Sequence, residues 1–233
     1  MRTRIFGIAF LIAACVTGSG WADELKIDFE GARCHEGDLN GQDSWQDSLG
    51  IHKITADGAL AGKQSLQIAQ PPPPNTADEY SQTGNEYAIR KISVDRGFVQ
   101  WSMLVKPIKE GEFHGRFDAE QGGPANVAGF YLDTRPAVRR VSGTEGGRFG
   151  KEGDVVVGNT YRVTVLFDFD PQQYTVKVDG IGNPTSISET FPFARGNMTR
   201  EQAAAGSILF RNVLLNDFDG KTLVDDITLG PKP

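Results

Sequence analysis

The sequence predicts an all-β protein, a single antiparallel β-sandwich of the jelly-roll type that follows an export signal. Three observations predict this. Apolar and polar residues alternate with period two in most of the regular segments. Turn-forming residues are abundant, with 28 glycines and 12 prolines among 233 residues. Residues 199–205 are the one stretch with helical character, and strands that do not alternate with helices favour a sandwich.

The first 22 residues have the pattern of a secretory signal peptide. Arg2 and Arg4 precede an apolar run of twelve residues, 5–16, and the small residues Gly20 and Ala22 stand at the −3 and −1 positions of a cleavage site. The run is too short for a membrane anchor, because about 20 residues are needed to cross about 30 Å of hydrocarbon. We therefore expect a secreted or periplasmic protein with no transmembrane span.

An alternative processing site lies inside this segment. Ile12 to Cys15 resembles a bacterial lipobox, in which Cys15 would be lipidated and become the first mature residue. Cleavage after Ala22 fits both the apolar run and the small-residue site, so we prefer it. Cys34 is then the only cysteine left, and no internal disulfide is expected.

The remaining chain is expected to form one domain, residues 23–233. Predicted strands cover, in order, residues 25–30, 64–68, 98–105, 112–120, 127–132, 161–169, 174–180, 207–215 and 223–229. Asp170 to Gln172 has the composition of a tight turn and predicts a hairpin between the sixth and seventh of these strands. The four prolines 71–74 read as a surface connector, because residues 23–70 alone are too short and glycine-rich for a good core.

Several segments resemble concanavalin A-like lectin/glucanase domains, including laminin-G-like modules of exported bacterial proteins. The hairpin 159–180 resembles theirs, with its Tyr-Arg-Val start and Val-Asp-Gly end, and the close 224–229 is shared with galactose-binding-like modules. Asp28 to Glu30, Leu39 to Trp45 and Gly62 to Leu66 look like the beginning of the bacterial members. The resemblance implies a jelly roll that binds a polysaccharide or glycoconjugate, and it does not fix an activity.

The strand 112–120 carries the densest set of titratable side chains. With period two, one face would hold Glu112, His114, Arg116, Asp118 and Glu120, and the opposite face would enter the core. Two carboxylates on one strand can act as acid and base or nucleophile in glycoside hydrolysis. The alternative is a solvated outer face with cross-strand ion pairs.

The same strand resembles the catalytic strand of laminarinase-like glucanases only in part. Asp118 and Glu120 match the last two positions of their Glu-x-Asp-x-Glu pattern, whereas Arg116 stands where that resemblance requires the nucleophile. A polysaccharide lyase would need a base and a cation beside a uronate carboxylate, roles open to His114 and Arg116. Catalysis by this face therefore stays one of two alternatives.

Acidic residues near both ends of the domain predict a structural calcium ion. Asp28 and Glu30 belong to the first predicted strand, and Asp225 and Asp226 to the last. First and last strands of sandwiches often lie side by side, and Ca²⁺ prefers 6–8 oxygen ligands. The alternative is that these residues form turns or protect a sheet edge.

Aromatic residues outside the strongest strands are candidates for stacking on sugar rings. The set is Trp45, Tyr80, Tyr87 and Tyr131. Trp45, in a polar loop, is the preferred one, although the family resemblance also suggests that it pins that loop. Trp101, within a strongly apolar strand, is expected in the core.

Composition narrows the function classes. The net charge of −6 argues against nucleic acid as the main partner. No Gly-x-Ser-x-Gly, P-loop or dinucleotide-binding motif occurs. A non-catalytic module for glycan binding or cell-surface interaction is the first hypothesis. A glycoside hydrolase or polysaccharide lyase and a structural envelope protein are the alternatives.

Overall fold

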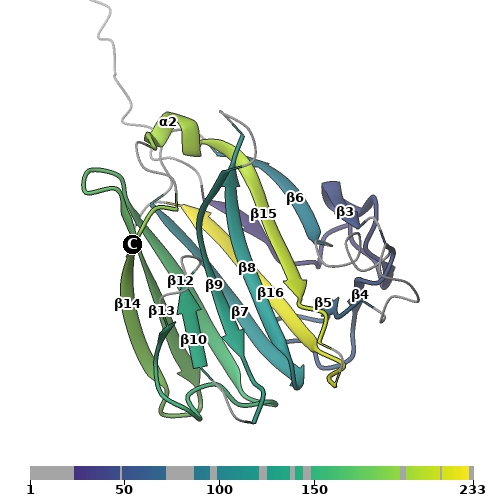
Figure 1. Cartoon of the computed structure of the whole chain (residues 1–233). Helices are drawn as coiled ribbons and strands as arrows, with labels where there is room; N and C mark the ends of the chain where they lie inside the picture. Colours follow the sequence, from purple (N-terminus) through teal and green to yellow (C-terminus); the bar gives the residue numbers. More distant parts are fainter. Residues whose placement is uncertain are drawn as a thin grey trace, which may run out of the picture.

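The protein folds as two antiparallel β-sheets packed face to face. The computed structural model describes residues 24–47, 49–71, 87–94, 99–120, 125–136, 140–143, 148–194, 198–215 and 217–230. Figure 1 looks onto the smaller sheet, with the larger one behind it and the short helix α2 at the upper end.

The larger sheet has nine strands and the smaller has seven. Across the nine-stranded sheet the order is β14 (Ser186–Pro192), β13 (Gln173–Ile181), β12 (Thr160–Asp168), β7 (Gln100–Lys109), β16 (Lys221–Gly230), β5 (Ser65–Ala69), β4 (Lys53–Thr55) and β2 (Gly37–Asp38), with β1 (Leu25–Ile27) also paired to β16. Across the seven-stranded sheet it is β11 (Arg148–Phe149), β10 (Arg140–Gly143), β9 (Ala125–Asp133), β8 (Glu112–Ala119), β15 (Ala205–Asn212), β6 (Ala88–Ser93) and β3 (Trp45–Asp47). The helical elements are η1 (Gln42–Ser44) and α2 (Arg200–Ala203).

Strands that follow one another in the chain often belong to different sheets. β7 lies in the larger sheet and β8 in the smaller, whereas β15 lies in the smaller sheet and β16 in the larger. In their sheets, β15 lies between β8 and β6, and β16 lies between β7 and β5. This two-sheet antiparallel sandwich confirms the predicted jelly roll.

The core consists of the inward-facing residues of both sheets. Along β12, Tyr161, Val163 and Val165 are fully buried, and the residues between them are partly exposed. The ring of Phe210 in β15 lies 6.0 Å from that of Trp101 and 5.8 Å from that of Phe113, measured between centroids. Alternation with period two therefore determines which side chains enter the core.

Most of the predicted strands are present, and the hairpin 161–180 is confirmed as β12 and β13. The first strand ends earlier than predicted, because Phe29 has a φ of 57°, in the left-handed region. Seven strands were not predicted: β2, β3, β4, β6, β10, β11 and β14. Five of these have only two to four residues, too few for a period-two pattern to stand out, and β14 has a single buried residue.

The predicted helical segment is confirmed as the short helix α2. Thr199 and Gln202 form a reciprocal capping box at its start. Within the described residues, no helix has the length and apolar character needed to cross a membrane. The predicted signal peptide 1–22 and the prolines 72–74 lie outside the described residues.

Candidate ligand-binding face

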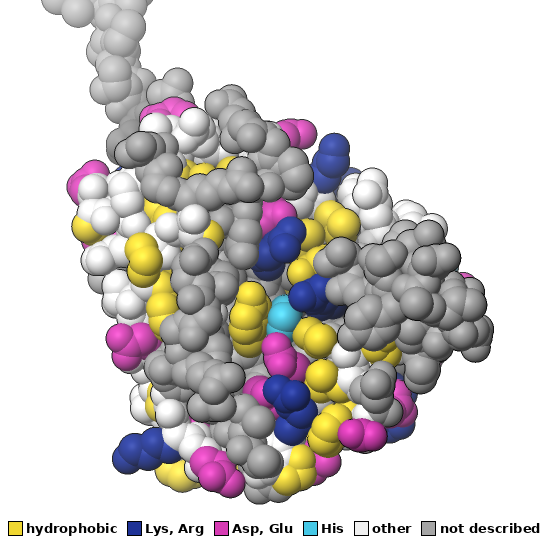
Figure 2. Space-filling model, in the orientation of Figure 1, with side chains coloured by type: hydrophobic (Ala, Val, Ile, Leu, Met, Phe, Trp, Pro, Cys, Tyr) yellow, Lys and Arg dark blue, Asp and Glu magenta, His cyan; other side chains and the backbone are white. Residues whose placement is uncertain are grey.

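The outer face of the seven-stranded sheet carries a connected group of charged and aromatic side chains. We call it the arginine–tyrosine face, and its members are Tyr87, Glu112, His114, Arg116, Asp118, Tyr131, Asp133, Arg135 and Arg211. Figure 2 shows a histidine in the middle of this side of the molecule, bordered by basic, acidic and apolar side chains.

The alternation along β8 determines which of its side chains reach this face. Phe113 and Phe117 are 1% and 0% exposed and enter the core, as predicted. The residues between them, His114 and Arg116, therefore point to the outer side. Gly115 faces inward between them, where a Cβ would lie 2.5 Å from a ring atom of Phe130. A glycine at this position lets the Phe130 ring lie against β8.

Strand register brings one row of the face together from three strands. His114 in β8 is directly opposite Arg211 in β15 on one side and Tyr131 in β9 on the other. The rings of His114 and Tyr131 are stacked, with 3.8 Å between their centroids and 22° between their planes. Tyr87, just before β6, extends the row, since the guanidinium carbon of Arg211 lies 4.7 Å from its ring centroid.

The contacts of His114 define the tautomer of its imidazole, and its lowered pKa defines the charge. The Nε of Arg211 lies 3.2 Å from its Nδ1, and Oε1 of Glu112 lies 2.6 Å from its Nε2. Because an arginine nitrogen only donates, Nδ1 accepts that bond and Nε2 donates to the carboxylate. Burial and the nearby Arg211 cation lower the pKa of His114, although the bond to Glu112 opposes this. The imidazole is therefore neutral near pH 7.

Arg116 is held by a buried carboxylate on its own strand. Its Nη2 lies 2.6 Å from Oδ2 of Asp118, and its Nη1 lies 3.4 Å from the hydroxyl of Tyr87. Its guanidinium carbon also lies 4.9 Å from the centroid of the Tyr87 ring. The guanidinium groups of Arg116 and Arg211 thus both lie over one tyrosine ring, and the attraction between a cation and the π-electrons of the ring stabilises both contacts.

Arg135, which follows β9, holds two further carboxylates. Its Nε lies 2.9 Å from Oδ1 of Asp133, and its Nη2 lies 3.0 Å from Oε2 of Glu112. The hydrogen bond from His114, together with the nearby cations, lowers the pKa of Glu112, so its carboxyl group is ionised. Hydrogen bonding to Asp133 raises the pKa of Arg135. Side-chain contacts therefore connect Arg135 through Glu112 and His114 to Arg211 on another strand.

Burial separates this face from the solvated face that the sequence offered as an alternative. His114 is 6% exposed and Asp118 is 5% exposed, although both point away from the core. A solvated face would also contain ion pairs, and ion pairs are present here. However, the carboxylates of Asp118 and Asp133 and the imidazole of His114 are more deeply buried than a solvated face requires. Burial also raises the pKa of the Tyr131 hydroxyl.

Glu120 lies at the margin of this arrangement. It follows the last residue of β8, its side chain is 64% exposed, and its carboxylate lies 3.9 Å from the Nζ of Lys91. Asp118 is bound to Arg116 instead. The contacts therefore provide no support for Asp118 and Glu120 as a catalytic carboxylate pair.

The prediction of Trp45 as a sugar-stacking residue is wrong. Trp45 is the first residue of β3, and its side chain is 1% exposed. Its ring centroid lies 6.0 Å from those of Phe29 and of Phe210. Its strand pairs with β6, which places the indole inside the sandwich. Trp101 is in the core as predicted. Tyr80 lies outside the described residues.

The four acidic residues predicted to bind calcium are engaged by other partners. Asp225 is fully buried and accepts hydrogen bonds from the backbone N–H of Ala61 and the hydroxyl of Ser65. Asp226 forms an ion pair with Arg162 at 2.9 Å. Burial raises the pKa of Asp225, which disfavours a charged ligand there.

The other two acids, Asp28 and Glu30, also accept backbone donors. Oε1 of Glu30 accepts from the N–H groups of Lys63 and Gln64, and Oδ1 of Asp28 accepts from that of Glu30. Within the described part of the chain, no group of three or more His, Cys, Asp or Glu residues is arranged to hold a metal ion. All four acids are thus already engaged by donors of the protein, and the calcium ion stays a prediction.

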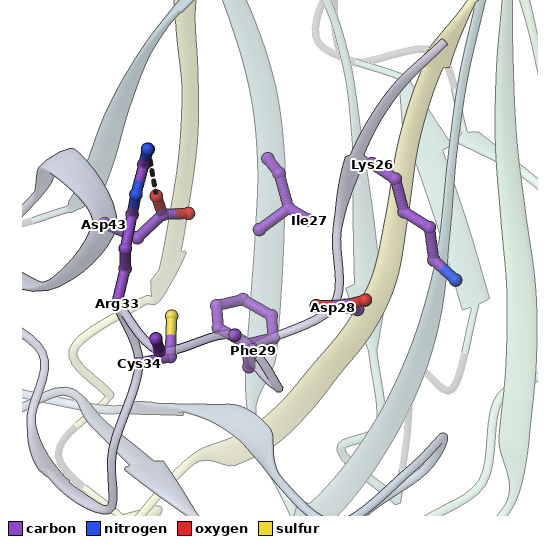
Figure 3. Close-up of a pocket in the computed structure, with 9 residues that line it drawn as sticks. Lys26, Ile27, Asp28, Phe29, Arg33, Cys34 and Asp43 are labelled. Carbon is purple, nitrogen blue, oxygen red and sulfur yellow. Dashed lines mark ion pairs between the residues drawn. The ribbon is translucent and has the colours of Figure 1, made fainter.

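Asp28 lines an open cavity of about 230 Å³ beside β1. Figure 3 shows Asp28 near Lys26 and, beyond Phe29, the Asp43 carboxylate facing Arg33. Asp43 lies 2.8 Å from Arg90 and 3.8 Å from Arg33, so it is already paired with cations. The cavity therefore presents mixed charges rather than a set of oxygen ligands.

Arg211, Arg135 and Asp133 were not among the predicted site residues. Arg211 had a local signal, since it is the one charged residue in the predicted strand 207–215. Inward-facing Ile208 and Phe210 place it on the outer side. That β15 lies beside β8 has no local signal, because 97 positions separate His114 from Arg211.

Comparison with known proteins supports the fold. No family model matches this sequence, and neither does any curated protein. Among solved structures, lectin II from Ulex europaeus has a TM-score of 0.50 and 9% identity, over 89% of this chain and 97% of its own. The metal-free form of lectin I-B4 from Griffonia simplicifolia has a TM-score of 0.50 and 8% identity, over 89% and 98%. At such identities the likeness shows the concanavalin A-like jelly-roll fold, as the resemblance implied.

Proposed function

We propose that this protein is a carbohydrate-binding module, and that the sugar lies on the arginine–tyrosine face. The observation that carries the proposal is the row formed by Tyr131, His114, Arg211 and Tyr87. Its members come from separate segments of the chain, contact one another, and are held by partners that are themselves buried. Preorganised side chains of this kind reduce the entropy lost on binding a flexible ligand.

The chemistry of the row suits a sugar. Tyr131 has a half-buried ring that is fixed in place by stacking on His114. A partly exposed aromatic ring can pack against the apolar C–H face of a pyranose while polar groups at its border meet the hydroxyls. The arginines and Glu112 provide donors and an acceptor beside that ring. The likeness to two lectins is consistent with this role.

The contacts support binding more than hydrolysis or elimination. A glycosidase needs a carboxylic acid whose pKa is raised, whereas the pKa of Glu112 is lowered by its bond to His114. A lyase needs a base with an available lone pair, but Nδ1 of His114 already accepts from Arg211. Assays for product release, with Glu120→Gln as a comparison variant, test the enzyme alternative.

Binding of immobilised and soluble glycans tests the proposal. We expect Tyr131→Ala to reduce affinity at least tenfold, because it removes the stacking surface, and Tyr131→Phe to retain most of it. Thr190→Ala, on the exposed outer face of the other sheet, is the matched control and should bind like the natural protein. Absence of binding to any glycan, or equal binding by Tyr131→Ala, would show that the proposal is wrong.

We also propose that residues 1–22 direct export, which would place the module where extracellular glycans occur. The support is the sequence pattern alone. N-terminal sequencing of the exported protein should find Asp23 first. A mature chain that begins with a lipidated Cys15 would favour the lipoprotein alternative, and an unprocessed chain would contradict export.

A further inference from the structure

We infer that the glycan bound by this face is anionic, carrying uronate carboxylates or sulfate esters that Arg116 and Arg211 bind. The inference rests on the proposed carbohydrate-binding function and adds the chemical class of the ligand. It follows from how the arginines are held, how deeply each partner is buried, and how charge balances over the face.

Each arginine of the face is anchored from below by a buried partner. Asp118 holds Arg116, the imidazole of His114 holds Arg211, and Asp133 holds Arg135. The anchors fix the guanidinium planes, and a planar fork in a fixed position matches the two oxygens of a carboxylate or sulfate.

Cations lie closer to the solvent than the acids that neutralise them. The side chain of Arg116 is 26% exposed and that of Asp118 is 7% exposed. The pair formed by Arg135 and Asp133 repeats this order, with 28% and 9%. A ligand that approaches this face therefore meets guanidinium groups before carboxylates.

Tyr87 brings the two central arginines to the same place. Their guanidinium carbons lie 4.9 Å and 4.7 Å from its ring centroid. The two guanidinium groups therefore lie less than 10 Å apart, so one ligand can contact both. A negatively charged group of that ligand is attracted by both cations.

Local charge balance argues for a specific ligand rather than for any polyanion. Among the described side chains named above, the three arginines are matched by Glu112, Asp118 and Asp133, with His114 neutral. Long-range attraction of nucleic acid requires an excess of positive charge, whereas the whole chain has a net charge of −6. Recognition must then depend on the geometry of the guanidinium groups.

Substitutions that preserve charge while removing the planar fork provide the test. Affinity is measured for polygalacturonate, alginate, chondroitin sulfate, a neutral β-glucan and duplex DNA, with the full chain and with Arg211→Lys and Arg116→Lys. Arg162→Lys, in an Arg–Asp pair on the other sheet, is the matched control. Circular dichroism verifies that each variant is folded.

We expect at least one acidic glycan to bind, and each of the two lysine variants to weaken it at least tenfold, while Arg162→Lys has no effect. Desulfated and carboxyl-reduced chondroitin sulfate then distinguish sulfate from carboxylate recognition. Binding of the neutral glucan alone would overturn the inference and leave the proposed function standing. Failure of every glycan would overturn both. Equal binding of duplex DNA, or lysine variants that bind acidic glycans normally, would also contradict the inference.

Discussion

The outer faces of the two sheets are built from the same alternating strands, yet their polar side chains make different kinds of contact. On the nine-stranded sheet these contacts join two or three side chains near water, such as Arg162 and Lys26 with Asp226, and the hydroxyls of Thr175 and Thr190 at 2.8 Å. On the seven-stranded sheet, contacts run continuously from Arg135 to Arg211 through Glu112 and His114. The first pattern is typical of a solvated surface. The second is typical of a site.

The two faces therefore differ in the burial and in the connectivity of their polar side chains. Arg116–Asp118 and Arg162–Asp226 are both Arg–Asp pairs, 2.6 Å and 2.9 Å apart. The carboxylate side chain is 7% exposed in the first pair and 23% exposed in the second. The two pairs therefore form a natural experiment on the effect of burial.

Removing the arginine from each pair should affect stability unequally. Arg116→Met leaves the Asp118 carboxylate buried without its cation, and we expect the free energy of unfolding to fall by about 3 kcal/mol. Arg162→Met should lower it by less than about 1 kcal/mol, because water and Lys26 remain near Asp226. Urea denaturation at pH 7 measures both values. Equal losses would remove the distinction between the two faces.

The pH dependence of stability should come in part from the arginine–tyrosine face. The pKa of His114 is lowered by burial, so the unfolded chain binds a proton that the folded protein rejects. The free energy of unfolding should therefore be constant above the ordinary histidine pKa of about 6.5 and fall as the pH drops below it. The slope is at most about 1.4 kcal/mol per pH unit for one group. The lowered pKa of Glu112 adds a further loss below about pH 4.5.

His52 is a second source of the same pH dependence. Its side chain is 1% exposed, and burial lowers its pKa as well, so it contributes in the same pH range. His114→Gln should therefore reduce the slope between pH 6.5 and 5 without abolishing it. Urea midpoints across that range measure the slope, and a variant with the slope of the natural protein would show that His114 does not titrate as inferred.

The sequence was sufficient to predict the fold and one strand of the site. Alternation along 112–119 separates Phe113 and Phe117, which are buried, from His114 and Arg116, which face outward. Such information is local, because side chains in a strand alternate whatever its neighbours are. Tyr131 and Tyr87 were also predicted as ligand contacts, and both lie on this face.

The partners of these residues required the three-dimensional structure. Arg211 reaches His114 only because β15 is inserted between β8 and β6, and pairing between distant strands leaves no trace in either strand alone. Trp45 failed as a prediction for a related reason. A tryptophan in a polar loop looked accessible, but the short strand β3 pairs with β6 and turns the indole into the core.

Modification of arginines by phenylglyoxal, mapped by mass spectrometry with and without a bound glycan, tests the location of the binding site most directly. Arg116 and Arg211 should lose reactivity when the glycan is bound, whereas Arg162 on the other sheet should keep its reactivity. Protection of Arg162, with Arg116 and Arg211 still reactive, would contradict the assignment of ligand binding to the arginine–tyrosine face.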